Sequence, residues 1–87
     1  MKHVVKRRGY KELYDQKKVY ASVYAAALNC HYDEHKAENI AREVMKKVSA
    51  WIKNKKVVTS DQIRDQVINA INDEEVILMY RHYLDLS

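Results

Sequence analysis

Basic side chains are concentrated at the start of the sequence, where they could bind phosphate. Residues 1 to 18 hold seven Lys and Arg side chains against two carboxylates, whereas residues 19 to 87 hold nine against ten. The net charge of +4 therefore arises entirely in the first fifth of the chain. Such a local positive field attracts phosphate on a nucleotide or on nucleic acid, and composition alone does not separate these two ligands.

Groupings that would support catalysis or metal binding are missing from the sequence. There is no Gly-rich phosphate loop, no nucleophile with a base and no paired acid and base, so we expect a protein that is not an enzyme. Cys30 is the single cysteine and is expected to be a small buried residue. His31 and His35 have the spacing of a helical metal pair, but Asp33 is expected to begin a helix between them, so no metal site is predicted.

A β-hairpin must position the basic segment. Residues 3–7 and 10–14 have the pattern of short strands, and Arg8 and Gly9 separate them. Gly9 is the only glycine in the chain. The sequence therefore predicts a hairpin with a two-residue loop.

This loop length predicts a register. Val4 would pair with Leu13, and Lys6 would stand opposite Lys11 on the same face. Like charges in that position cost stability, and an anion between the two lysines would relieve the repulsion.

Hydrophobic periodicity predicts two helices after the hairpin. Asp15 can cap a first helix that reaches about Asn29, and Asp33 can cap a second that reaches about Asn54. The inward positions recur at helical spacing, namely Val19, Val23, Ala26 and Ala27 in the first helix and Ala37, Ile40, Ala41, Val44, Met45, Val48, Trp51 and Ile52 in the second.

The remaining elements complete an α+β fold. Val57 and Val58 predict a short strand that pairs with the hairpin, and Thr59 with Gln62 has the pattern of a capping box. A fourth helix would begin at about Asp73 or Glu74. The expected inward residues are Ile63, Val67, Ala70 and Ile71 in the third helix and Val76, Ile77, Tyr80, Tyr83 and Leu84 in the fourth. We predict one domain over residues 1–87, in which a small three-stranded sheet caps a four-helix bundle.

The order of these elements and two motifs resemble the ATP-cone family. The first motif is Val4-Val5-Lys6-Arg7-Arg8-Gly9, followed by Glu12, Tyr14-Asp15 and Lys18-Val19, and the second is Val58-Thr59-Ser60-Asp61. The resemblance extends from Val4 to Leu86. It implies a non-catalytic regulatory domain that binds ATP or dATP under a small sheet, with Mg²⁺ as an optional companion of the triphosphate. Since ATP-cones occur in ribonucleotide reductases and in the repressor of their genes, the implied protein partner is a larger enzyme or regulator, or a second copy of the chain.

The resemblance also implies roles for the charged residues. Lys6 and Arg7 would contact the phosphates, and a guanidinium beside an ammonium suits a polyphosphate. Glu12 and Asp15 would read the base, because a carboxylate accepts from the N6 amine of adenine and repels the O6 acceptor of guanine. The alternatives are a solvated strand for Lys6, Arg7 and Glu12 and a helix cap for Asp15. Lys18 would contact phosphate or ribose.

Four further residues complete the implied site. Val4, Tyr14 and Val19 would form an apolar wall for the base. Thr59 would bond phosphate at the start of the third helix, where unpaired amides and the helix dipole favour an anion. Core packing for Val19 and an ordinary N-cap for Thr59 are the alternatives. The chain departs from the family pattern at Arg8, because Asp or Asn usually precedes the glycine and arginine tolerates a positive φ poorly.

A nucleic-acid-binding module is the rival interpretation. The isoelectric point near 9.2 and the helix-turn-helix pattern of residues 59–72 favour it. Asp61 and Asp65 oppose it, since acidic side chains do not suit a recognition helix. We therefore do not expect nucleic acid as a partner. An oligomerisation module would instead expose an apolar stripe on the second helix.

The sequence shows neither a signal peptide nor a membrane-spanning stretch, so the protein is expected to be cytoplasmic with no membrane partner.

Overall fold

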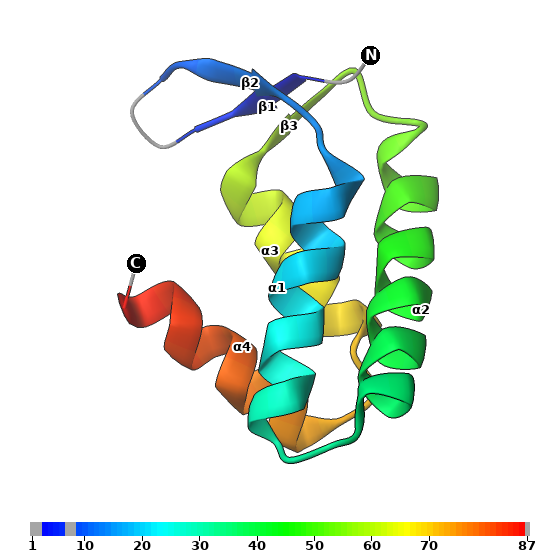
Figure 1. Ribbon diagram of the computed structural model, residues 1–87. Helices are drawn as coiled ribbons and strands as arrows, with labels where there is room; N and C mark the ends of the chain where they lie inside the picture. The colour runs from blue at the N-terminus through cyan, green and yellow to red at the C-terminus, as the bar shows by residue number, and fades with distance from the viewer. Residues whose placement is uncertain (1–2, 7–8, 87) are drawn as a thin grey trace.

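The computed structural model describes residues 3–6 and 9–86, and side chains as far as His82. The elements follow the order β1 (His3–Val5), β2 (Lys11–Leu13), α1 (Gln16–Asn29), α2 (Glu34–Ile52), β3 (Val57–Thr59), α3 (Ser60–Ala70) and α4 (Glu74–Leu86). A three-stranded mixed sheet lies at one end of the four described helices (Figure 1). The predicted α+β fold is confirmed.

The helices begin where the sequence supplies side-chain acceptors. Asp15 and Asp33 each accept a hydrogen bond from a backbone amide in the first turn of α1 and α2. At α3 the Gln62 amide donates to Thr59 Oγ1 over 3.1 Å, and the Thr59 amide donates to Gln62 Oε1 over 3.0 Å. Each bond satisfies an amide that the helix itself leaves unpaired. The three predicted caps are therefore confirmed.

Small side chains allow α1 and α2 to pack closely. Ala26 and Ala27 of α1 and Ala37 and Ala41 of α2 are completely buried. The rest of this main core is formed by Val19, Val23, Val44, Val48, Val67, Ile71, Val76 and Tyr80. Small side chains at these four positions let the two helices approach closely, because the distance between packed helices depends on the side chains at the contact.

Most predicted inward positions are buried, and some lie at the edge of the core. The half-buried members of the predicted set are Ile40, Met45, Trp51, Ile63, Ala70 and Ile77. Cys30 was expected to be buried, but it is half-buried beside the main core because it follows the last turn of α1. The side chains of Tyr83 and Leu84 lie outside the described residues.

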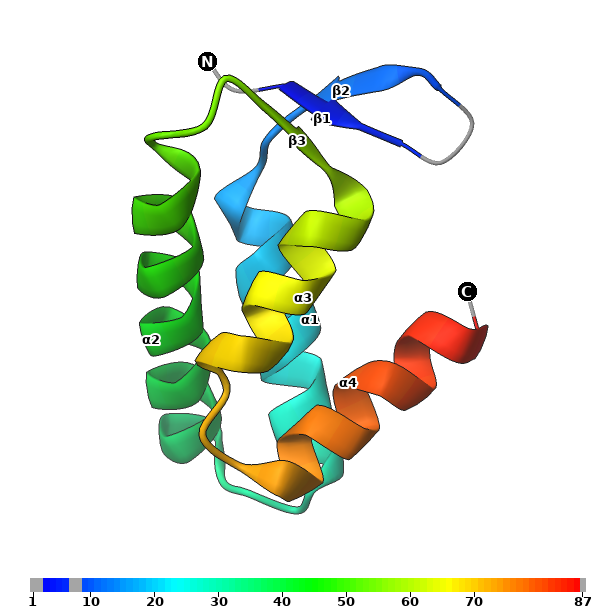
Figure 2. The same ribbon diagram turned by 180° about the vertical axis from the view of Figure 1, so that it is seen from behind.

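A second, smaller core joins the sheet to the helices. Val4, Val58 and Ile52 are buried together beneath the sheet. β1 is the central strand, antiparallel to β2 and parallel to β3. The predicted pairing of the segment at Val57 and Val58 with the hairpin is confirmed, and it places a face of the sheet over the bundle (Figure 2).

The hairpin loop is one residue longer than predicted. The Lys6 amide donates to the Tyr10 carbonyl and the Gly9 amide donates to the Lys6 carbonyl, both over 2.9 Å. Three residues therefore connect the paired positions, and Gly9 has a φ of +88°. Glycine adopts this left-handed conformation without steric cost, and it is the usual third residue of such loops. Arg8, where we expected a strained turn, lies outside the described residues, as does Arg7.

The longer loop makes the predicted register wrong by one residue. Val4 pairs with Glu12 rather than Leu13, and Val5 pairs with Lys11. Lys6 is therefore not opposite Lys11, and the expected like-charge repulsion between them is absent. Because alternate residues of a strand face opposite sides, Glu12 lies on the inner face with Val4. The strands are also shorter than the two five-residue segments predicted, at three residues each.

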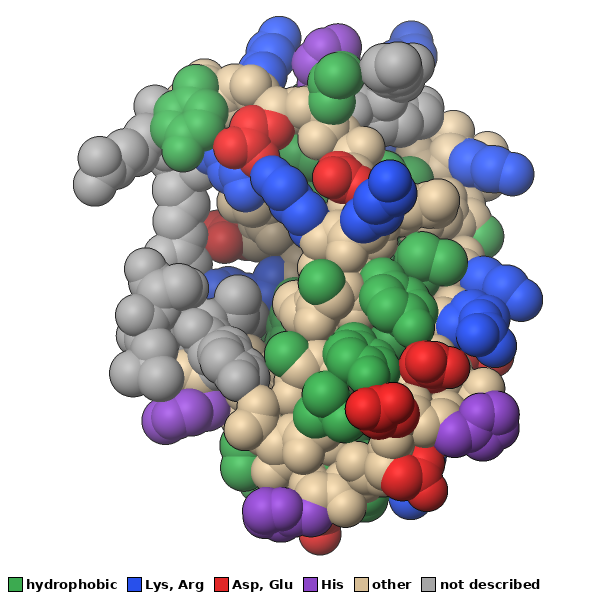
Figure 3. Space-filling view, in the orientation of Figure 1, with side chains coloured by type: hydrophobic (Ala, Val, Ile, Leu, Met, Phe, Trp, Pro, Cys, Tyr) green, Lys and Arg blue, Asp and Glu red, His purple; other side chains and the backbone are tan. Residues whose placement is uncertain are grey.

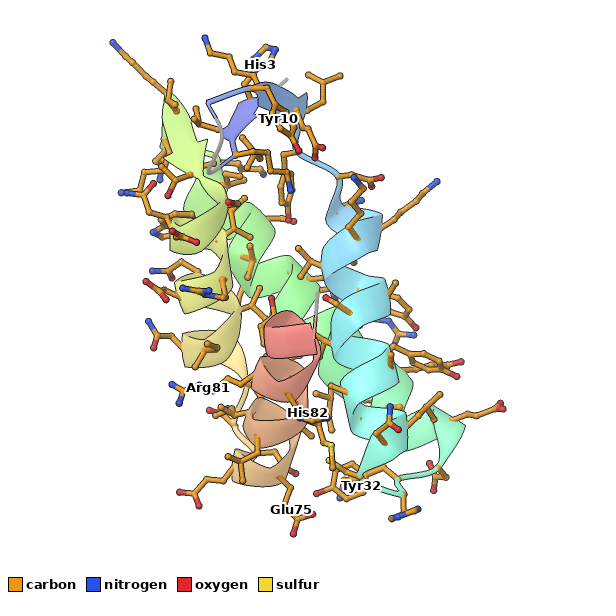
Figure 4. The ribbon with its side chains drawn as sticks, turned by 90° about the vertical axis from the view of Figure 1, so that its left-hand side faces the viewer. His3, Tyr10, Tyr32, Glu75, Arg81 and His82 are labelled. Atoms are coloured by element: carbon orange, nitrogen blue, oxygen red, sulfur yellow. The ribbon has the colours of Figure 1, made fainter. Side chains whose placement is uncertain are left out.

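A hydrogen bond ties two loops together at the end of the bundle opposite the sheet, where Figure 4 labels Tyr32. The Tyr32 hydroxyl, between α1 and α2, donates to Asp73 Oδ2 over 2.5 Å. Asp73 Oδ1 accepts from the amides of Glu75 and Val76 at the start of α4. The bond raises the pKa of Tyr32 to about 12, and the same bond holds the pKa of Asp73 below its usual value. The Asp73 carboxylate thus connects the α1–α2 loop to α4.

Replacing Tyr32 by Phe is expected to lower the free energy of unfolding at pH 7, because the hydrogen bond to Asp73 is lost. Because the pKa of Asp73 is lower in the folded state than in the unfolded state, the ionised carboxylate stabilises the fold at pH values above the unfolded pKa of about 3.8. This stabilisation is lost as the pH falls through the pKa of Asp73 in the folded protein. The difference in unfolding free energy between wild type and Tyr32→Phe should therefore shrink as the pH falls below 3.8. Urea unfolding at pH 7 and at a series of acidic pH values measures it, with Tyr24→Phe as the control. A difference that does not change with pH would contradict the role of Asp73.

Candidate functional site

A pocket of about 610 Å³ lies beneath the sheet. It is bounded by the hairpin, α1 as far as Ala25, the start of α3 and one side chain of α4. Figure 3 shows the molecule hollowed below the hairpin, where acidic and basic side chains lie close to one another. The volume is within the range of pockets that hold small molecules. The lining residues are Val4, Lys6, Glu12, Leu13, Tyr14, Asp15, Lys18, Val19, Ser22, Ala25, Ser60, Asp61, Ile63, Arg64 and Tyr80.

The pocket collects most of the site residues that the sequence predicts. Those that line it are Val4, Lys6, Glu12, Tyr14, Asp15, Lys18 and Val19. Arg7 lies outside the described residues. Thr59 is not part of the lining, although the next two residues of the chain are. Side chains from β1, β2 and α1 are thus brought to one cavity.

The charged side of the pocket is organised around Glu12. Its Oε2 atom lies 3.4 Å from Lys6 Nζ and 3.6 Å from Lys18 Nζ. Lys6 follows β1 and Lys18 lies on α1, so a single carboxylate oxygen links the hairpin to the helix. The Lys18 side chain is 71% exposed and the other two are about one third exposed, so solvent reaches all three groups.

The connection between β2 and α1 is held by two side chains of the pocket. The Tyr14 hydroxyl lies 3.0 Å from Ser49 Oγ of α2, and the Tyr14 ring packs against both cores. Asp15 Oδ1 accepts from the Lys17 amide over 2.9 Å and so caps α1. A carboxylate that uses one oxygen for a cap keeps its second oxygen for another donor. Asp15 therefore serves the fold and also lines the pocket.

The first turn of α3 forms part of the pocket wall. Ser60 and Asp61 occupy its first turn and line the cavity, whereas the Thr59 hydroxyl accepts from the Gln62 amide. A hydroxyl that accepts one bond retains its own hydrogen for donation. The first amides of a helix and its dipole favour an anion, and the carboxylate of Asp61 partly opposes this field.

Sequence reasoning missed a polar group on the far wall of the pocket. Arg64 lies four residues after Ser60 and so faces the same way on α3, and its guanidinium is 3.8 Å from Asp61 Oδ1. Burial raises the pKa of Tyr80, while Arg64 and a hydrogen bond with Ser22 act in the opposite direction. The four-residue spacing from the helix start is the signal that could have revealed Arg64. Tyr80 was predicted only as a core residue.

Neither a metal site nor a membrane-spanning helix is found in the described part of the chain. Among the side chains that the structure describes, no group of three or more His, Cys, Asp or Glu residues is arranged to hold a metal ion. His31 lies in the turn before α2, with Asp33 capping the helix between it and His35 as predicted. None of the helices in this part of the chain has both the length and the apolar surface needed to cross a membrane.

Comparison with known families identifies the kind of domain. The sequence matches the ATP cone domain family over residues 2–87, nearly the whole chain. The chain belongs to the ATP-cone family. An ATP-cone is a nucleotide-binding regulatory domain, and the order of strands and helices here agrees with the resemblance noted in the sequence. No curated protein sequence matches this ATP-cone.

The capping box of this ATP-cone predicts the effect of substitution at Thr59. Thr59→Ala is expected to lower the free energy of unfolding of the ligand-free chain by about 1 kcal/mol, because the Gln62 amide loses its acceptor. Thr59→Ser keeps the hydroxyl and should stay within about 0.5 kcal/mol of wild type. Chemical denaturation without nucleotide provides both values. Equal stability of the Ala and Ser variants would mean that the hydroxyl does not cap α3.

Proposed function

We propose that the pocket beneath the sheet binds ATP or dATP and that the domain is a non-catalytic sensor of that nucleotide. The convergence of Lys6, Glu12 and Lys18 on one cavity carries the proposal. These residues come from three parts of the chain, and the hairpin register brings Glu12 to the inner face. Membership of the ATP-cone family supports a nucleotide as the ligand.

The cavity has a polar side suited to phosphate. The ammonium groups of Lys6 and Lys18 lie within 4 Å of the same oxygen, so one polyphosphate could contact both. Arg64 and the first turn of α3 supply further donors on the opposite wall. Arg7, adjacent to Lys6, is proposed as a further phosphate contact. The Thr59 hydroxyl is proposed as a further donor to phosphate, although Thr59 does not line the pocket in this structure.

The apolar side of the cavity is suited to a purine base. Val4 and Val19 are buried, and Ile63 and Tyr14 are half-buried beside them. Flat apolar walls favour an aromatic ring, and nearby carboxylates select the base that presents an amine. We therefore assign the N6 amine of adenine to Glu12 together with Asp15. Any Mg²⁺ would arrive with the triphosphate, and the carboxylate oxygens lining the pocket are of the ligand type that it prefers.

For the domain to regulate another molecule, ligand binding must change a surface that this molecule contacts. The pocket touches α4 at Tyr80, and Leu78 and Met79 of the same helix are exposed, Leu78 to 65%. Occupation of the pocket would bias the position of α4 through Tyr80. The proposed binding partner of this surface is a larger enzyme or regulator, or a second copy of the chain.

Adenine should be preferred over guanine by at least about tenfold, because an unpaired buried polar group costs about 1 to 3 kcal/mol and 1.4 kcal/mol is a factor of ten. Glu12→Gln should narrow the ratio of ATP to GTP affinity, since a carboxamide can turn its donor toward O6 of guanine. Calorimetric titration of wild type and variant with ATP, dATP and GTP measures both effects. Equal wild-type affinities for ATP and GTP would eliminate the adenine-sensor proposal.

Lys6→Ala should weaken ATP and GTP equally, by about 1.5 to 3 kcal/mol, which is the range for hydrogen bonds to charged groups. Lys46→Ala is the matched control, because it removes the same charge from the exposed face of α2. A folded Lys6→Ala variant with wild-type affinity would remove the phosphate role of Lys6.

Titration with duplex DNA tests the nucleic-acid alternative. Tight binding of DNA that weakens steeply with added salt and is not displaced by ATP would support that alternative instead.

A further inference from the structure

One carboxylate oxygen already occupies the position between the two lysines of the pocket. Glu12 Oε2 lies within 3.6 Å of both Lys6 Nζ and Lys18 Nζ. An oxygen of a bound polyphosphate would need the same two donors. A phosphate must therefore displace the carboxylate before it can bridge these ammonium groups.

The carboxylate is always present as a competitor because it is attached to the chain. A tethered group has an effective concentration in the millimolar range, set by the short connection. Glu12 is held close to both lysines by the pairing of β1 with β2, where it stands opposite Val4. Dilute free anions must overcome this internal competitor.

We propose that Glu12 is a specificity-determining residue that makes the site select nucleoside triphosphates over polyphosphates without a base. When the Glu12 carboxylate leaves the lysines, adenine offers it the N6 amine as a new donor. The carboxylate therefore keeps a hydrogen-bond partner after the exchange. A bare polyphosphate has no such donor and places its own negative charge beside a displaced carboxylate. This inference rests on the proposed function, because it takes the pocket to be the nucleotide site.

The expected size of the effect is modest. All three side chains are partly exposed, and ion pairs of this kind have small and salt-dependent strengths. Loss of two such pairs corresponds to a gain of about threefold to tenfold in the affinity for a base-free polyphosphate at low ionic strength. The gain should decrease as salt is added.

The test is calorimetric titration of the full chain with inorganic tripolyphosphate and with ATP, at low ionic strength. Glu12→Gln should raise tripolyphosphate affinity about threefold to tenfold and leave ATP affinity the same or lower. Glu43→Gln is the matched control, because it removes one carboxylate and its exposed ion pair with Lys47 from α2, outside the pocket. Its effect on tripolyphosphate should stay below about twofold.

A double-mutant cycle with Lys18→Gln tests the direct contact. The gain from Glu12→Gln should be smaller in the Lys18→Gln background, since one of the two ion pairs is already missing. Equal gains from Glu12→Gln and Glu43→Gln would overturn the proposal, and so would equal gains for tripolyphosphate and ATP. If wild type binds ATP and Glu12→Gln leaves tripolyphosphate unchanged, this inference alone fails. If wild type does not bind ATP, the proposed function fails with it.

Discussion

The backbone conformation at Gly9 determines which side chains of the hairpin face the helices. Its positive φ accommodates a three-residue connection, and the Lys6 and Tyr10 backbones then pair with each other. Because side chains alternate along a strand, a shift of one residue would exchange the inner and outer faces of β2. Glu12 would then point to solvent, and Lys11 would lie over the helices in its place. The charged side of the pocket therefore depends on a loop that contributes no described side chain to it.

The sheet must also be fixed relative to the helices for the pocket to exist. Val4 and Val58 are buried against Ile52, and the contact of Tyr14 with Ser49 holds the chain that connects β2 to α1. The cavity consequently has walls from the sheet, α1, α3 and α4, so a ligand there would contact four elements at once. At the opposite end, Asp73 ties the start of α4 to the α1–α2 loop, while the far end of α4 points away from α1 (Figures 1 and 2). A ligand that contacts both a fixed and a projecting element has a physical route to regulation.

Features that depend on local sequence could be predicted, and those that depend on tertiary contacts could not. Helical periodicity and the acceptors Asp15, Asp33 and Thr59 predicted the helices and their starts, because caps and buried stripes are encoded within a few residues. The register was wrong, since one glycine is compatible with two loop lengths and only the pairing of the strands distinguishes them. Arg64 was missed for a related reason, because its place in the pocket depends on how α3 packs beneath the hairpin. The family motif predicted seven residues that the fold does bring together.

Chemical-shift mapping shows whether ATP binds in the cavity under the sheet. Backbone amide spectra of the ¹⁵N-labelled chain should change on addition of ATP in β1, β2, the first half of α1 and the start of α3. The exposed side of α2, remote from the cavity, should change little. Perturbations that cluster on α2, or spectra that remain unchanged at millimolar ATP, would contradict the account.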